Sequence, residues 1–318
     1  MKQKRVLVLV GLLLLLPISV GIAAVVGLGS VHNPAILSLR LARILGAGFA
    51  GAALSVSGAI LQAILRNPLA DPYVLGISAG GGLGAALMIV IGGLAALGIW
   101  SVPVASFAGA ILTIFLVYAL ARKGGKVPTH SLLLSGVVVG AVFGSILMFI
   151  VSTTQASTLH GVMGWLLGDT EIQHAPMLYI LIAAVVVGIG VALLFSRDLN
   201  VMVLGEEPAA HLGLHVERVK KMFFVLSSLI TGATVAACGL IGFVGLIVPH
   251  TVRLAIGPDH RYLIPASALG GASFLILADM AAHVLMPPQV IPIGVVTALL
   301  GGPFFIFLLR RRKRAYWG

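Results

Sequence analysis

Long apolar runs alternate with short polar stretches along almost the whole chain. Each run approaches the length of a membrane-spanning helix, about 20 residues for a bilayer core of about 30 Å. The runs lack the strict alternation of apolar and polar residues that is typical of barrel strands. We therefore predict an all-α polytopic membrane protein whose ten spans cover residues 6–27, 44–65, 73–98, 103–121, 131–152, 176–195, 222–238, 242–256, 263–284 and 290–309.

Composition supports this reading and limits the number of domains. Of 318 residues, 59% are hydrophobic and 9% are charged, whereas a soluble domain carries about 25% charged residues. The first run is too long for a signal-peptide core of about 7–15 residues, so we expect it to be retained as a helix. We predict one transmembrane domain, residues 1–318, that contains a polar, helix-compatible internal segment at 196–221.

The basic residues predict an orientation. With the N-terminus placed inside, only Arg40 and Arg43 of the 20 Lys and Arg residues fall outside. Because Lys and Arg gather in cytoplasmic loops, we predict that both termini are cytoplasmic. The net charge of +11 then reflects membrane topology and not nucleic-acid binding.

A faint internal repeat is visible. A shift of 181 residues places Gly51 on Gly232 and Pro68 on Pro249. Spans 2–5 and 7–10 would then form two halves of inverted topology, which in transporters surround a central path. Chance matches are the alternative, because the chain contains 40 glycines.

Few residues suggest chemistry. The chain lacks a GxxxxGK[ST] phosphate loop and an HExxH motif. Cys238 stands alone in an apolar run, which excludes a disulfide framework and a cysteine metal site. We predict no catalytic residue, no metal site and no cofactor bound by this chain.

Histidines in the predicted loops have ordinary interpretations. His211 and His215 have the i,i+4 spacing of some metal sites, but two neighbouring glutamates favour a solvent-exposed helix face. His160 and His174 are predicted outside, where they could contact a ligand such as haem or be plain loop residues.

Two features fall within the spans. Gly136, Gly140 and Gly144 recur every four residues, which fits close helix packing and equally a glycine face that lines a wide substrate path. Asp279 is an intramembrane carboxylate, a candidate functional group, four residues before His283. A local pair with His283 and a role in the path remain open for it.

Several blocks of sequence carry a family resemblance. The chain reads RNPLADPYVLGIS at 66–78, GFVGLIVPH at 242–250, GPDHR at 257–261, IPIG at 291–294 and GPFF at 302–305. In this order the blocks closely resemble the FecCD family of ABC permeases, which includes vitamin B12, siderophore and haem importers. The resemblance covers nearly the whole chain.

The resemblance implies a larger machine. Such permeases form homodimers, or close heterodimers, in the bacterial or archaeal inner membrane, with the path along the dimer axis. Two cytoplasmic ATPase subunits bind ATP and Mg and supply the energy, and a periplasmic or lipid-anchored binding protein delivers the substrate. The permease itself is then not an enzyme, and its cargo is expected to be a metal chelate.

The resemblance also assigns sites. It places an ATPase-coupling helix at Gly205, Glu206, Glu207, Ala209, Leu212 and Gly213, and a cytoplasmic gate at Asn67, Leu69, Thr129 and His130. It makes Gly136, Gly140 and Gly144 part of the translocation path. Arg40 and Arg43 match an Arg-Leu-Pro-Arg docking motif for the binding protein, with Ala42 in place of the proline, and His283 stands where the family often has a third docking arginine.

Two rival classes fit less well. A secondary transporter needs titratable groups at mid-depth, and only Asp279 comes close. A channel needs a polar pore ring, which is not evident. Within the family, an iron siderophore, haem, a corrinoid and an oxyanion such as molybdate all remain open as ligands.

Overall fold

The structure is a computed structural model that describes residues 2–26, 34–172 and 174–316, with the side chains of 2, 34, 35, 94 and 307–316 left undescribed. These ranges are helical apart from turns and one short backbone bridge between Lys123 and Lys126. The elements are α1 (Lys2–Val25), α2 (Pro34–Ile64), η1 (Pro72–Leu75), α3 (Ile77–Val90), α4 (Gly93–Leu97), α5 (Ser101–Ala121), α6 (Thr129–Thr153), α7 (Ala156–Leu166), α8 (Ala175–Leu194), α9 (Ser196–Met202), α10 (Glu206–His211), α11 (Val216–Cys238), α12 (Val244–Ile256), α13 (His260–Val284) and α14 (Ile293–Tyr316).

Each predicted span is occupied mainly by helix, so the prediction of an all-α polytopic membrane protein is confirmed. Seven described helices are long and apolar enough to cross a membrane: α1, α2, α5, α6, α8, α11 and α13. The remaining three spans correspond to shorter apolar helices, namely α3, α12 and the first part of α14.

The boundaries differ in three places. Helix α2 begins at Pro34 and not at residue 44, so much of the predicted outer loop 28–43 is helical, and its first part lies outside the described residues. The predicted span 73–98 is divided into η1, α3 and α4 by Gly76 and Gly92, both with positive φ. Helix α7 occupies the stretch predicted as an outer loop at 153–175.

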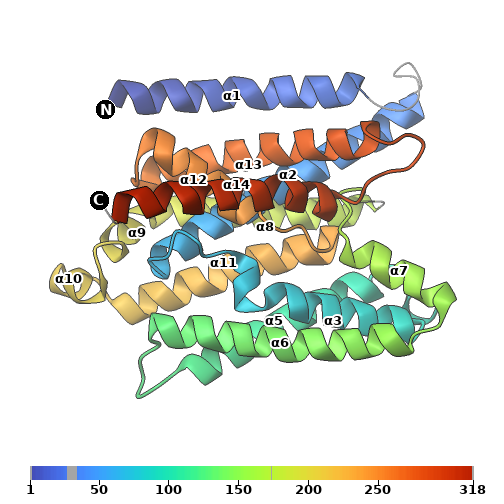
Figure 1. Cartoon of the computed structure of the whole chain (residues 1–318), viewed down its shortest axis with the longest axis horizontal. Coiled ribbons are helices and arrows are strands. Elements are labelled where there is room, and N and C mark those ends of the chain that lie inside the picture. Colours follow the sequence, from blue (N-terminus) through green and yellow to red (C-terminus); the bar gives the residue numbers. More distant parts are fainter. Residues whose placement is uncertain (1, 27–33, 173, 317–318) are drawn as a thin grey trace.

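Helix α2 is the centre of the bundle. Its most apolar window is 89% buried, against 11% for α1 and for α6, which lie along opposite edges in Figure 1. Helices α11, α12 and α13 pack on α2. The backbones approach so closely that a Cβ atom on Gly58 would collide with the Gly245 carbonyl, and one on Gly51 with the Gly271 carbonyl. Small residues therefore set this packing, as is common between membrane helices.

The main helices of the two predicted halves follow the same order, although η1 and α4 of the first half have no counterpart in the second. Each begins with a long helix (α2, α11), continues with a short one of 14 residues (α3) or 13 residues (α12), and ends with two long ones. The shift of 181 residues is not kept at the prolines, because Pro68 follows α2 while Pro249 lies inside α12.

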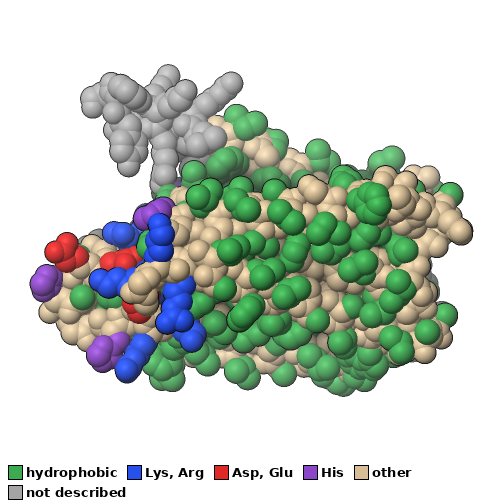
Figure 2. All heavy atoms as spheres, turned by 90° about the horizontal axis from the view of Figure 1, so that it is seen from below, with side chains coloured by type: hydrophobic (Ala, Val, Ile, Leu, Met, Phe, Trp, Pro, Cys, Tyr) green, Lys and Arg blue, Asp and Glu red, His purple; other side chains and the backbone are tan. Residues whose placement is uncertain are grey.

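The two ends of the bundle differ in polarity. Figure 2 shows charged side chains gathered at one end of the visible face, with apolar side chains over most of the remainder. Helices α9 and α10 lie at this end, and Figure 1 shows that α1 begins and α14 ends there too. The polar segment predicted at 196–221 therefore forms one pole of the molecule.

Candidate functional site

Helix α10 is a short, separate element at the charged pole. Its six residues follow Gly205, whose φ is +122°, and its Ala209 side chain is fully buried. At its end the Leu214 N–H donates to the Ala209 carbonyl (3.0 Å) and Gly213 has φ +85°. Gly213, the left-handed residue directly after the C-cap Leu212, stops the helix, while Leu212 stays 65% exposed.

The helix end corrects one expectation. His211 is the last residue of α10 and His215 is the N-cap of α11, so the two histidines do not share a helix. Both are exposed, which confirms the solvent-exposed reading. Within the described residues, no group of three or more His, Cys, Asp or Glu is placed to hold a metal ion.

The start of α6 lies against α10. The Thr129 hydroxyl donates to Glu206 Oε1 (3.2 Å), and the Lys220 ammonium of α11 lies 2.8 Å from the same oxygen. Burial, the largest single influence, would raise the pKa of the Glu206 carboxyl. The hydrogen bond and charge of Lys220, the Thr129 hydrogen bond and the charge of Arg66 together outweigh it, so this pKa lies below its usual value.

Some of the predicted coupling and gate residues line one cavity. They are Gly205, Glu206, Glu207, Thr129 and His130, whereas Ala209, Leu212, Gly213, Asn67 and Leu69 are not part of its lining. A space of about 450 Å³ is lined by Arg66, Pro128, Thr129, His130, Leu204, Gly205, Glu206, Glu207 and Pro208. It brings the start of α6, the loop before α10 and the end of α2 together. Sequence spacing alone gave no reason for this proximity, since these segments are far apart in the chain.

The turn after α2 is built by its own side chains. Asn67 Oδ1 accepts from the Leu69 N–H (3.0 Å), and Asp71 Oδ1 accepts from the Tyr73 N–H (2.8 Å) and so caps η1. The Tyr73 hydroxyl then accepts the Ile241 N–H (2.6 Å), which ties η1 to the link between α11 and α12. Tyr73 belongs to the RNPLADPYVLGIS block, but sequence alone does not predict this contact.

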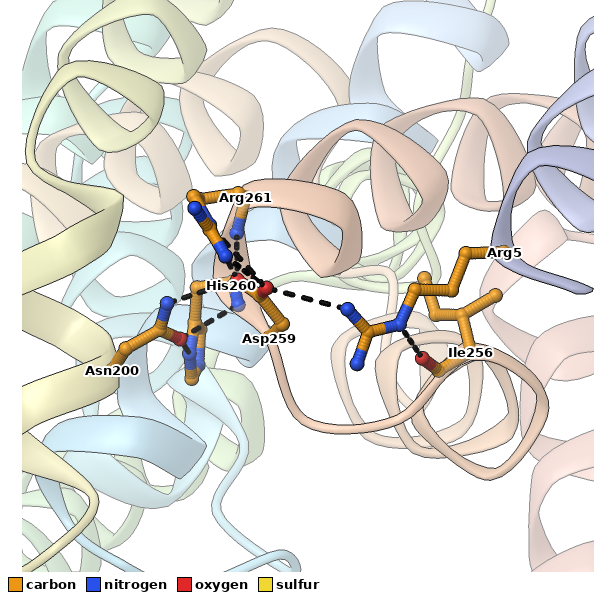
Figure 3. A network of polar contacts seen from close by, with 6 residues as sticks. All are labelled: Arg5, Asn200, Ile256, Asp259, His260 and Arg261. Carbon is orange, nitrogen blue, oxygen red and sulfur yellow. Dashed lines mark hydrogen bonds and ion pairs between the residues drawn. The ribbon is translucent and has the colours of Figure 1, made fainter. Parts of the chain in front are cut away.

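A second polar cluster joins four helices at the same pole (Figure 3). Asn200 of α9 donates to Asp259 Oδ1 (2.9 Å) and accepts from the His260 N–H (2.8 Å). Arg5 of α1 donates to the Ile256 carbonyl (3.0 Å) and lies 3.4 Å from Asp259 Oδ2. Asp259 and His260 belong to the GPDHR block, but sequence alone does not predict that they meet Arg5 and Asn200.

Asp259 carries the charge of this cluster. A hydrogen bond from Arg261 holds the pKa of the Asp259 carboxyl well below its usual range, against the opposing effect of burial, and the Asn200 contact adds to the lowering. The cluster therefore contains an ionised carboxylate that links α1, α9, α12 and α13.

The outer pole departs from the sequence-based picture. Arg40 is 5% exposed and donates to the Ala24 carbonyl of α1 (2.7 Å). Arg43 Nε lies 3.0 Å from Asp279 Oδ2, an ion pair whose N–H is not aligned as a hydrogen bond. Helix α2 extends past both arginines, and each contacts a neighbouring helix, Arg40 on α1 and Arg43 on α13.

Asp279 is held by several partners. Besides the Arg43 pair, it accepts a hydrogen bond from the Thr170 hydroxyl. His283 Nδ1 is 2.9 Å from the Asp279 main-chain carbonyl and 3.8 Å from its carboxylate. These contacts favour a structural pairing of Asp279 over a role in the path. Its nearest charged partner is Arg43, at 3.0 Å, and not His283, at 3.8 Å. His160 is exposed on α7 and His174 is the N-cap of α8.

The glycines of α6 divide into two groups. A Cβ on Gly136 would lie 2.8 Å from the Leu75 Cα, and one on Gly140 would lie 3.3 Å from the Gly76 Cα. Both glycines therefore let α6 pack closely on η1, while a Cβ on Gly144 would meet nothing within 4 Å. The three do not form one open face within a single subunit.

Residues 6–311 match the FecCD transport family. The chain belongs to this family. It is 43% identical over 276 residues to the cobalamin import system permease of Halobacterium salinarum, covering 87% of this chain and 73% of that one. It is 38% identical over 280 residues to the hemin transport system permease of Yersinia pestis, covering 87% and 83%.

A solved structure agrees with the fold. An inward-facing metal-chelate type ABC transporter is 30% identical, with a TM-score of 0.88 that covers 96% of this chain and 99% of that one. Membership of the family makes this chain a membrane permease subunit of an ABC transporter and not an enzyme, since ATP hydrolysis belongs to a separate subunit. Its long apolar helices make it an inner-membrane protein.

Proposed function

We propose that this chain is the permease of a binding-protein-dependent importer for a metal chelate, namely an iron siderophore, haem or a corrinoid. A second permease subunit, most simply an identical copy, completes the path. Two ATPase subunits dock at the charged pole, and a binding protein delivers cargo at the opposite pole. Both termini then lie in the cytoplasm.

The observation that carries this proposal is the cavity shared by α10 and the start of α6. A force applied to α10 from the cytoplasm reaches Thr129 through the Glu206 hydrogen bond, and Thr129 begins a helix that is mostly unburied in the single subunit. The chain has no phosphate loop of its own, so ATP has to act through a separate subunit that contacts this chain at the charged pole.

The cargo class rests on the relatives. Permeases for cobalamin (43% identical), hemin (38%) and Fe(3+)-citrate from Bacillus subtilis (38%) resemble the chain to a similar degree. Such an even resemblance supports metal chelates as a class and does not single out one of them. Selectivity is then expected to reside in the binding protein.

Docking of the binding protein remains a proposal for the outer pole. Arg40 and Arg43 already make contacts inside the chain, so docking through them would require these contacts to be exchanged. His283, with a side chain 15% exposed, lines a cavity of about 230 Å³ with Asp169, Thr170 and Glu171.

Reconstitution tests the proposal. The permease is purified with its ATPase and binding protein, placed in liposomes, and supplied with cyanocobalamin, hemin or a ferric siderophore. We expect ATP-dependent uptake of one class and ATPase stimulation by the loaded binding protein. Uptake that proceeds without ATP would contradict the proposal.

A further inference from the structure

A buried lysine stands at the junction between α10 and α6. Lys220, in the second turn of α11, is 2% exposed. Its ammonium donates to the Val127 carbonyl (2.8 Å), to Glu206 Oε1 (2.8 Å) and to Glu217 Oε1 (3.3 Å). All three donor positions of the ammonium are thus used, as expected for a charge removed from water.

Glu217 and Lys220 also form hydrogen bonds with the main chain just before α6. Glu217 Oε2 accepts the Val127 N–H (3.1 Å), while the Val127 carbonyl accepts from Lys220. Residues 217 and 220 are three apart on α11, which puts them on one helix face. Two residues later, the Thr129 hydroxyl donates to Glu206.

These contacts make a chain of three links. Helix α10 supplies Glu206, helix α11 supplies Lys220 and Glu217, and the segment entering α6 supplies Val127 and Thr129. Helix α10 packs on α9 and α11. Its Glu206 carboxylate accepts hydrogen bonds from Lys220 of α11 and from Thr129 of α6, so this carboxylate connects α10 to α6. Arg66, which lines the same cavity, also acts electrostatically on Glu206.

We propose that Lys220, held by Glu206 and Glu217, is the positioning residue that transmits movement of α10 to the start of α6. The inference rests on the proposed function and adds the residues through which its coupling operates. When α10 shifts, Glu206 has to keep its hydrogen-bonded partners or leave a buried ammonium short of an acceptor, which is strongly unfavourable. The Lys220 ammonium and the Val127 peptide therefore move with α10, and α6 begins to move at its first turn.

The test compares three variants in the complete reconstituted complex. Glu206→Gln removes the charge but keeps the shape, at a side chain that is 35% exposed and so tolerant of change. Lys220→Gln removes the other charge. The double variant Glu206→Gln/Lys220→Gln removes both charges. Lys221→Gln is the matched control, because Lys221 is the exposed next residue of α11 and its ammonium lies over the Tyr118 ring (5.8 Å) and not in the cluster.

The decisive readout is the number of chelate molecules transported per ATP hydrolysed. We expect it to fall by about tenfold in both single variants, within the range typical of coupling between two sites. It should fall no further in the double variant, because groups that act as one unit are not additive, and it should be unchanged in Lys221→Gln. Size-exclusion profiles and thermal unfolding show whether each variant is folded. If Lys220→Gln does not fold, Glu206→Gln still decides the question.

A second readout follows the gate itself. A spin label at residue 130, introduced as His130→Cys in a Cys238→Ala background, reports the distance between the two permease subunits with and without ATP. We expect this distance to respond to ATP in the parent and to stop responding in Glu206→Gln. Variants that are folded and couple as well as the parent would overturn the inference. A parent complex that hydrolyses ATP without any transport would instead contradict the proposed function.

Discussion

At the scale of single residues, the backbone around α10 depends on two glycines. Gly205 has φ +122° and Gly213 has φ +85°, conformations that side chains with a Cβ atom rarely adopt. A Cβ on Gly213 would meet nothing within 4 Å. Any effect of substitution there therefore comes from the backbone and not from a steric collision.

Substitution of Gly213 therefore tests the backbone conformation at the end of α10. Gly213→Val forces a β-branched residue to φ +85°, at a cost of about 1–2 kcal/mol, which should unwind the C-cap of α10. We expect transport per ATP to fall while the subunit remains folded. Gly213→Asn is the control, because asparagine tolerates the left-handed region. Equal transport by both variants would show that the cap geometry is not required.

The buried ion pair of Arg43 and Asp279 is a second residue-scale feature. Their side chains are 13% and 4% exposed, so removing one partner leaves a charge without its counterion. Asp279→Asn should lower stability by about 3 kcal/mol. The double variant Arg43→Gln/Asp279→Asn should recover much of that loss. Thermal unfolding in detergent measures the cycle, and additive effects of the two single changes would show that the pair is not coupled.

At the scale of elements, apolar run length predicted the spans and little else. The central helices were found because α2 and α11 each contain an apolar stretch long enough to cross a membrane. The early start of α2 was missed because the arginines at 40 and 43 read as a loop, although each is satisfied by a neighbouring helix. Helix α7 was missed because its Ser, His and Gly residues interrupt the apolar pattern.

The candidate site shows the same limit. The family blocks located α10, Asn67 and Thr129, but the Glu206–Lys220 contact joins segments that no periodicity connects. Lys220 was placed in the polar segment 196–221 and was counted only toward the membrane topology. Its burial depends on the tertiary arrangement of α6, α10 and α11, which a sequence pattern does not contain.

The attachment of α1 is an element-scale consequence of the Asp259 cluster. Helix α1 is largely unburied, and Arg5 connects it to the turn between α12 and α13 through Asp259 and the Ile256 carbonyl. The Arg5 guanidinium also lies over the Tyr262 ring (5.1 Å). Asp259 thus holds a peripheral helix to the bundle.

The lowered pKa of Asp259 gives this attachment a pH dependence. A carboxylate with a depressed pKa contributes stability that is present above its unfolded-state pKa, about 3.9, and is lost as pH falls through the folded value. Asp259→Asn should therefore lower stability at pH 7 and reduce the further loss on acidification. Asp198→Asn, which changes a carboxylate of α9 that has no ion pair among the described residues, is the control. Parallel pH profiles of thermal unfolding for Asp259→Asn and the parent would contradict this role.

At the scale of the whole molecule, the two poles differ in their charged side chains. The pole with α9 and α10 holds the hydrogen-bonded cluster of Glu206, Lys220 and Thr129 and the Asp259 cluster. The opposite pole holds α7 and the internally paired Arg43. Charge is thus concentrated where an ATPase partner would bind, as the bias of Lys and Arg toward cytoplasmic loops requires.

This asymmetry predicts the orientation in the membrane. Cys238, the one cysteine of the chain, is buried, so a Cys238→Ala background gives a blank for labelling single introduced thiols. Lys123→Cys lies in the exposed turn between α5 and α6, and Ser157→Cys lies at the exposed start of α7. A membrane-impermeant maleimide is added to cells whose inner membrane is intact and whose outer envelope has been made permeable. It should label residue 157 at once and residue 123 only after the inner membrane is opened. The reverse pattern would place α10 on the outer side, where no ATPase could reach it, and would remove the basis for both the coupling and the gate.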